Sequence, residues 1–355
     1  MVSVEGQRAV LEREERVSWR LSEADWQAVT KAWGYPAYYG KVIWKWLWQK
    51  GMTDPMAYTD LPKALREKLL AAYSWPVAGL RASAESRDGT RKFLWEMPEG
   101  GQVESVWIPQ GKRATLCLSS QIGCSLNCRF CATGQLGLER NLQDYEIYLQ
   151  YHAIRHEFAL PVTNIVYMGM GEPLLNFSAV VGSLIFLTRG AGLSSRRITI
   201  STVGIPKGIR RLAEVEMDFE LAVSLHSAIE EKRRALIPLA ERISLAELKE
   251  SLGYYCQRRR DWITIEYVLL EGVNDGPEDV VALRDFITPP VQAKVNLIVY
   301  NPVPGISFRP SRRMAAFQEA LLRRGLIATI RRSRGSDIAA ACGQLARHYS
   351  LRKST

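Results

Sequence analysis

The sequence predicts an α/β fold: a partial or closed (β/α) barrel with a small N-terminal helical accessory domain and a β-hairpin extension. Three observations predict it. From residue 115 onward, short runs of β-branched and apolar residues alternate with segments of helical periodicity. Glycine-rich, polar and cysteine-bearing motifs follow the ends of these runs, as expected at the carboxyl-terminal rim of a parallel barrel. The first 90 residues show helical spacing instead.

Composition sets the class of protein. The chain has 355 residues, of which 47% are hydrophobic and 24% charged, so we expect a globular protein of about two domains. Charged residues interrupt residues 1–20, and no stretch approaches the roughly 18 to 20 uncharged apolar residues of a membrane span. We therefore expect a cytoplasmic protein without a membrane partner. The net charge of +10 favours a polyanionic partner.

Residues 1–90 are expected to form the accessory domain and to contact RNA. One helix is predicted to begin at residues 21–25 and another to span residues 38–51. Lysines alternate here with tryptophans, so the aromatic rings could stack on bases or could pack in the core of the domain. The six tryptophans of this stretch are Trp19, Trp26, Trp33, Trp44, Trp46 and Trp48.

A hairpin linker and the barrel follow. Residues 91–114 alternate with period two around the turn 98–101, which predicts a β-hairpin. The barrel is predicted over residues 115–348 and a basic tail over residues 349–355. Its expected strands are 115–119, 164–168, 197–201, 219–225, 262–269, 294–300 and 326–331, and three of its expected helices contain 145–158, 245–252 and 314–321.

The cysteines identify the place to look for function. Four of the six lie within fifteen residues, which is no disulfide framework in a cytoplasmic chain of this length. Cys124-x3-Cys128-x2-Cys131 provides three thiolates on one loop, where a structural zinc site or a ferredoxin cluster needs four ligands. Three ligands to a [4Fe–4S] cluster leave one iron free to bind a further molecule. Zinc with Cys117 as fourth ligand is the alternative.

This spacing after a first barrel strand resembles that of the radical S-adenosylmethionine (SAM) enzymes. The resemblance implies one [4Fe–4S] cluster per chain, held by the three cysteines, and SAM as cofactor. Gly169-Met170-Gly171-Glu172 resembles the element with which that superfamily holds the methionine end of SAM, with Gly171 and Glu172 as contacts.

Longer motifs narrow the resemblance to one family. The segments concerned are 119–124, 130–134, 140–142, 169–174, 224–226, 300–302 and 341–345. From about residue 104 to residue 345 the chain resembles the RlmN/Cfr adenosine methyltransferases. That family methylates adenine at carbon 2 in the RlmN branch and at carbon 8 in the Cfr branch. Ile122, residues 132–134 and the tryptophan-rich N-terminal segment favour the carbon-2 branch.

The resemblance also implies a mechanism. A first SAM would methylate Cys342, and a second would yield the radical that activates this methyl group, so two SAM are consumed per methylation. The methylene radical would join Cys342 to the base. Cys117 would then resolve the protein–RNA adduct and leave a disulfide.

Further positions take roles from the same resemblance. Glu104 stands where the family has a proposed proton acceptor, although a glutamate on an alternating strand is usually on the solvated face. His226 could instead be a structural histidine, and Cys256 is expected in the core. The positions that match SAM contacts, besides the glycine-rich element, are Ser201, Ser224, Leu225, His226 and Asn301.

The expected partners are 23S rRNA and tRNA, an electron donor such as flavodoxin and a thiol reductant. Arginine pairs, among them Arg331-Arg332, fit phosphate contacts in sum, although each alone is typical of a solvated helix face. Three alternatives stay open: a carbon-8 methyltransferase that confers ribosomal antibiotic resistance, a radical enzyme acting on a protein or small molecule, and a non-catalytic Fe–S or zinc RNA-binding protein.

Overall fold

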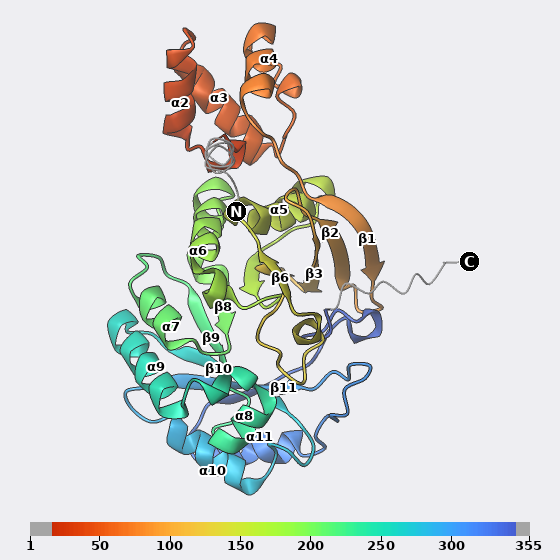
Figure 1. Ribbon diagram of the computed structural model, residues 1–355, viewed down its shortest axis with the longest axis vertical. Helices are drawn as coiled ribbons and strands as arrows, with labels where there is room; N and C mark the ends of the chain where they lie inside the picture. Colours follow the sequence, from red (N-terminus) through yellow and green to blue (C-terminus); the bar gives the residue numbers. More distant parts are fainter. Residues whose placement is uncertain (1–15, 346–355) are drawn as a thin grey trace, which may run out of the picture.

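The structure is a computed structural model that describes residues 16–345 (Figure 1). The expected basic tail, residues 349–355, and the charged stretch before residue 16 lie outside the described residues. Within them, helices α2 to α4 stand apart at one end of the molecule, and the remaining elements surround one large sheet (Figure 1).

The N-terminal helices pack around a small aromatic core. They are η1 (Ser18–Arg20), α2 (Glu23–Ala32), α3 (Tyr38–Trp44), η2 (Lys45–Gln49), η3 (Pro55–Ala57) and α4 (Lys63–Ala72). Ser22 begins α2 with a capping box, in which its hydroxyl and the Asp25 carboxylate bond each other's backbone N–H. Trp26 is buried in this core, whereas Trp19 and Trp48 are buried in the main core of the molecule, so packing is confirmed as the role of these three.

Ten strands form the main sheet, in the order β1-β2-β3-β4-β7-β8-β9-β10-β11-β12. The first four strands of this order pair antiparallel with one another. From β4 through the six strands that begin with β7, neighbouring strands pair in parallel. No pairing joins β12 to β4 within residues 16–345, so the barrel is partial. The strands are β1 (Gly79–Glu85), β2 (Arg91–Glu96), β3 (Gln102–Gln110), β4 (Arg113–Cys117), β7 (Asn164–Tyr167), β8 (Ile198–Thr202), β9 (Glu220–Ser224), β10 (Ile263–Leu269), β11 (Ala293–Val299) and β12 (Ala328–Arg331).

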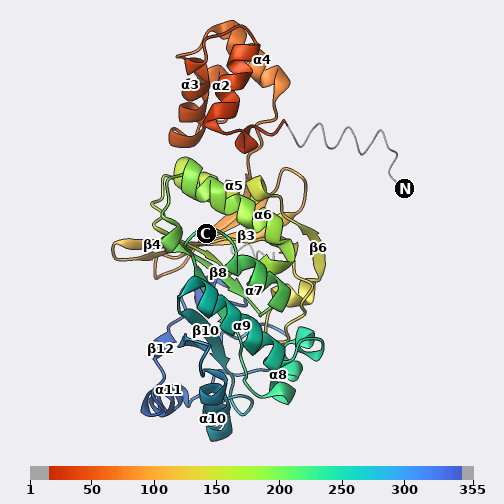
Figure 2. The same ribbon diagram turned by 90° about the vertical axis from the view of Figure 1, so that its left-hand side faces the viewer.

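Helices between the parallel strands cover one face of this sheet, where α5, α6, α7 and α9 form a row (Figure 2). They connect successive strands, as parallel pairing requires. They are α5 (Asp144–His152) with η5 (Ala153–Glu157), η6 (Pro173–Asn176), α6 (Phe177–Ile185) with η7 (Phe186–Gly190), η8 (Ser195–Arg197), α7 (Pro206–Ala213), α8 (Glu230–Leu236), η9 (Pro238–Glu241), α9 (Leu245–Arg259), α10 (Pro277–Phe286) and α11 (Met314–Arg323).

Two sequence expectations need correction. Pro173–Gly190 is long and apolar enough to cross a membrane, against the expectation that no segment comes close. Val180, Leu184 and Leu187 of this segment are buried in the main core, so it is a helix of the protein interior. Gly79–Glu85 is a strand in a stretch expected to be helical, because this exposed edge strand has no apolar alternation and is fixed by pairing with β2.

A glycine sets the distance between α2 and α3. A Cβ at Gly40 would lie 2.3 Å from the backbone N of Gln27, so the helices would have to move apart. We predict that Gly40→Ala lowers the free energy of unfolding by about 1–3 kcal/mol, measured by denaturant titration with tryptophan fluorescence. Gly79→Ala, whose Cβ would meet nothing closer than 3.8 Å, is the control and should change stability by less than about 0.5 kcal/mol. Equal effects of the two variants would contradict this packing.

Candidate active site at the carboxyl-terminal rim

The three clustered cysteines lie on the loop of residues 124–131, here called the triad loop. It begins at a two-stranded sheet of β5 (Gln121–Gly123) and β6 (Leu138–Asn141) and is followed by η4 (Thr133–Leu136). The Cys124 N–H donates to the Gly137 carbonyl at 2.8 Å, which fixes the start of the loop. Burial raises the pKa of all three thiols, that of Cys124 to about 11. A bound metal would have to offset this cost of ionising them.

One cavity, the triad cavity, collects the three cysteines and most other expected site residues. Among residues 16–345 no three Cys, His, Asp or Glu side chains are grouped so as to hold a single metal ion. In a [4Fe–4S] cluster each cysteine binds a different iron, so its ligands need not meet at one point. The donor set of three thiols therefore fits such a cluster. The residues from the sequence motifs that line the cavity are Cys124, Cys128, Cys131, Gly171, Glu172, Ser201, Ser224, His226, Asn301 and Cys342.

The glycine loop, residues 169–172, lies directly against the segment that follows β4. Met170 accepts hydrogen bonds at its carbonyl from the N–H groups of Ser120 (2.9 Å) and Gln121 (3.2 Å). A Cβ at Gly169 would lie 2.7 Å from the carbonyl oxygen of Leu118, and one at Gly171 would lie 2.8 Å from the N of Gln121. Gly171 also has φ +98°, where side chains are strained. Only glycine permits this approach.

Glu172 is fixed at the end of this loop. Its carboxylate accepts hydrogen bonds from the N–H groups of Leu174 (3.0 Å) and Val203 (2.9 Å), and burial raises its pKa. Its own N–H donates to the side-chain oxygen of Gln121 at 2.7 Å. The Thr202 side chain is a third partner of the carboxylate, so one of its four lone pairs is left for a further donor such as an ammonium group.

The remaining expected SAM contacts separate into those that line the triad cavity and Leu225, which does not. The contacts that line the cavity are Ser201, Ser224, His226 and Asn301. His226 has φ 58°, and its Nδ1 accepts a hydrogen bond from the Val268 N–H at 3.0 Å. Burial and Arg233 lower the pKa of His226 to about 3, so the ring is neutral and carries its proton on Nε2. Leu225, in contrast, is fully buried and does not line the triad cavity.

Arg233 of α8 does not line either cavity but supports the strand ends beside them. It is buried, and its guanidinium donates to the carbonyls of Val203 (2.6 Å) and Leu225, at the ends of β8 and β9. Burial lowers its pKa to about 10, while Cys128 acts in the opposite direction. The sequence of α8 does not indicate that Arg233 is buried, because the helix consists mostly of charged residues and is typical of an exposed one.

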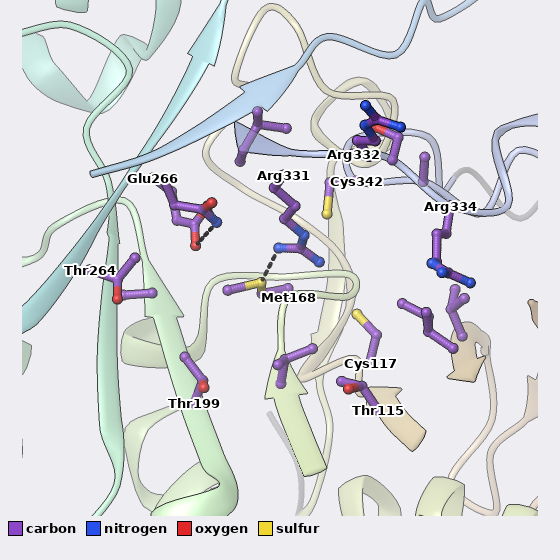
Figure 3. A pocket seen from close by; sticks show the side chains of 18 of the residues that line it. Thr115, Cys117, Met168, Thr199, Thr264, Glu266, Arg331, Arg332, Arg334 and Cys342 are labelled. Carbon is purple, nitrogen blue, oxygen red and sulfur yellow. Dashed lines mark hydrogen bonds between the residues drawn. The ribbon is translucent and has the colours of Figure 1, made fainter. Parts of the chain in front are cut away.

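Cys342 lines the triad cavity and also a second, larger cavity, here called the barrel cavity, with a volume of about 670 Å³. Asn301 donates from Nδ2 to the Cys342 carbonyl at 3.4 Å. Cys117, at the end of β4, lines the barrel cavity only, and both thiols are free. Figure 3 shows Cys117 and Cys342 on the walls of this cavity. Residues 225 positions apart thus share one space. Zinc ligation by Cys117 is not favoured by this placement.

Arg331 lies in the same cavity, and its assignment to a solvated face is wrong. It contacts the Met168 sulfur through Nη1 at 3.4 Å, near Cys117 and Cys342 (Figure 3). Cys342 raises the pKa of Arg331 most, with Glu266 and Cys117 acting in the same direction. Burial raises the pKa of Cys117 to about 12, Cys342 raises it further, and Arg331 opposes both. Arg331 is thus the positively charged side chain that lies near both thiols.

Glu104 is not on a solvated strand face. It is fully buried on β3 and forms an ion pair with Lys92 Nζ at 2.9 Å. It lies outside the residues that line the two cavities, two positions from Val106, which lines the barrel cavity beside Cys117. Cys256 is buried in α9, as expected.

Comparisons with known proteins agree with this geometry. The family model of the radical SAM superfamily matches residues 118–287. A probable dual-specificity RNA methyltransferase RlmN of Flavobacterium psychrophilum is 43% identical over 318 residues, covering 87% of this chain and 91% of the relative. The dual-specificity RNA methyltransferase RlmN of Solidesulfovibrio magneticus is 43% identical over 323 residues, covering 88% and 91%.

A solved structure shows the same fold. The crystal structure of a radical SAM methyltransferase from Sphaerobacter thermophilus superposes with a TM-score of 0.86 at 36% identity, over 93% of this chain and 98% of that one. The chain belongs to the RlmN family of radical SAM methyltransferases.

Proposed function

We propose that this protein methylates carbon 2 of an adenosine in 23S rRNA and in tRNA, through a methyl-cysteine at Cys342 and an adduct resolved by Cys117. The observation that carries the proposal is that Cys342 lines both the triad cavity and the barrel cavity, while Cys117 lines the barrel cavity. Membership of the RlmN family supports the substrate assignment, because its curated relatives are dual-specificity RNA methyltransferases.

The triad loop would hold a [4Fe–4S] cluster, which when bound supplies the electron that cleaves SAM to a radical. Gly171 and Glu172 would hold the amino-acid end of SAM, with Ser201, Ser224, His226 and Asn301 around it. Cys342 would accept the first methyl group and then present that methyl group toward the triad cavity. We propose that the protein acts in the cytoplasm, where a flavodoxin-type donor would provide the electrons.

Cys117 would release the product. Its thiolate attacks the sulfur of Cys342, an S–S bond forms, and the C–S bond to the base breaks with its electron pair going to carbon, which takes up a proton to become the methyl group. Arg331 would stabilise the Cys117 thiolate, because its positive charge acts to lower the pKa of that thiol. A thiol reductant would then restore both cysteines. We propose that Glu104, which lies behind the cavity wall in an ion pair with Lys92, receives the ring proton through an intervening water and not by direct contact.

The RNA would approach the barrel cavity. Basic side chains lie along its lining, and their charge suits phosphate groups around an extruded adenosine. We propose that residues 16–90 extend this surface, since Lys41, Lys45 and Lys50 are exposed there. The basic residues that line the cavity, besides Arg331, are Arg113, Lys294, Arg332 and Arg334.

Nucleoside mass spectrometry tests the function. In a host without its own enzyme, the wild-type chain should give 2-methyladenosine in 23S rRNA and tRNA. Cys342→Ala should abolish it, because no methyl carrier remains. Cys256→Ala, buried in α9 and outside both cavities, is the matched control and should keep the product. Cys117→Ala should accumulate protein covalently bound to RNA.

The outcomes separate the alternatives. 8-Methyladenosine would assign the Cfr type of reaction instead. Neither product, from protein with a loaded cluster, would contradict the proposal in favour of another radical substrate or a binding protein. Absence of the Cys117→Ala adduct would contradict the resolving role alone.

Alkylation of Cys117 tests its electrostatic environment. Because its pKa is raised to about 12, the thiolate fraction and hence the alkylation rate should rise about tenfold per pH unit without a plateau up to pH 10. Arg331→Gln should slow the reaction at pH 9 about three- to tenfold, since it removes the stabilising cation. Arg324→Gln, exposed at the end of α11, is the control. Peptide mass spectrometry measures the rates, and a plateau below pH 9 would contradict the burial effect.

A further inference from the structure

A buried carboxylate in the barrel has no part in the chemistry described so far. Glu266 of β10 is 4% exposed, and burial raises its pKa. It lines both the triad cavity and the barrel cavity, as Cys342 does. Figure 3 shows Glu266 on the wall of the barrel cavity, across from Arg331 and Cys342.

The contacts of Glu266 leave part of its carboxylate available. Asn296 of β11 donates from Nδ2 to Oε1 (3.1 Å) and Oε2 (2.9 Å), and Arg331 acts on Glu266 as a nearby positive charge. One amide group cannot satisfy the four lone pairs of a carboxylate. A buried charge of this kind is costly, so a further donor at the cavity side would stabilise it.

We propose that Glu266 accepts a hydrogen bond from the exocyclic amino group of the target adenine and thereby selects adenine. This inference rests on the proposed function. The reacting ring must lie beside Cys342, in the space whose wall includes Glu266. Adenine presents an N6 amino donor, whereas guanine presents an O6 acceptor that a carboxylate repels. Glu266 is thus a specificity-determining residue that binds the base.

The pairing with Asn296 makes glutamine a suitable replacement. The Asn296 amide donates, so in Glu266→Gln it would hold the new carbonyl oxygen, and the new amide NH₂ would face the base. That group is a donor and cannot accept from N6. Glu266→Gln therefore keeps size and the Asn296 contact while it removes the acceptor.

An internal competition tests the assignment. Purified holoenzyme acts on an equal mixture of two target RNAs, one with adenosine and one with purine riboside, which lacks the amino group, at the methylated position. The product ratio gives the ratio of kcat/KM and does not depend on how much enzyme is active. Glu266→Gln should lower the preference for adenosine about 10- to 100-fold relative to wild type, as expected for one hydrogen bond to a charged group.

Glu220→Gln is the matched control. Glu220 also lines the barrel cavity, but on the neighbouring strand β9, four residues before Ser224, the register partner of Glu266, which is roughly 13 Å along the strand. It should keep the wild-type preference. Glu266→Asp, which retracts the acceptor, should give an intermediate preference and replaces Glu266→Gln if that variant forms too little product.

The outcomes are distinguishable. If both RNAs are methylated more slowly by Glu266→Gln and the preference is unchanged, Glu266 is only structural and the inference is wrong. If the wild-type enzyme itself forms no 2-methyladenosine, the proposed function fails first. A preference that falls with Glu266→Gln and persists with Glu220→Gln supports the inference.

Discussion

The site depends on the direct backbone contact between the segment after β4 and the glycine loop. Residues 118–121 and 169–172 bond to each other through main-chain groups, including the Gly169 N–H to the Leu118 carbonyl at 3.0 Å. The Ser119 hydroxyl adds a bond from the Met170 N–H at 2.8 Å. This contact fixes the triad loop, Cys117 and Glu172 relative to one another, because all three are attached to it within a few residues. Any side chain at residue 169 or 171 would separate the two segments.

The second constraint is the path of residues 332–345 across the open side of the partial barrel. Several contacts hold it, among them Ser86 Oγ to Asp337 (2.6 Å) and Arg334 Nη1 to the Pro109 carbonyl (3.0 Å). At its far end, the Ala132 N–H donates to the Gly343 carbonyl at 2.7 Å. Cys342 is thereby held beside the triad loop at one side and Cys117 at the other, which is the arrangement that a methyl carrier with a resolving partner requires.

Much of this architecture could be predicted from the sequence, because parallel strands are buried and read as apolar runs with motifs at their ends. The predicted strand 164–168 corresponds to β7, and the motif residues that follow such strands meet in one cavity. Arg331, Glu266 and Arg233 could not be identified this way. Their importance arises from burial beside residues distant in sequence, and a charged residue in a short strand or helix carries no local sign of that. The exposed edge strand β1 was missed for a similar reason: only its pairing with β2 defines it.

The central claim is that Cys117 and Cys342 act as one pair, and a single-turnover experiment tests it most directly. Reduced wild-type enzyme is mixed with substrate RNA and SAM without thiol reductant, quenched by alkylation, and mapped by peptide mass spectrometry. We expect a disulfide between Cys117 and Cys342 in amounts that match the 2-methyladenosine formed. Methylated RNA without this disulfide, or with Cys342 bonded to a different cysteine, would contradict the account.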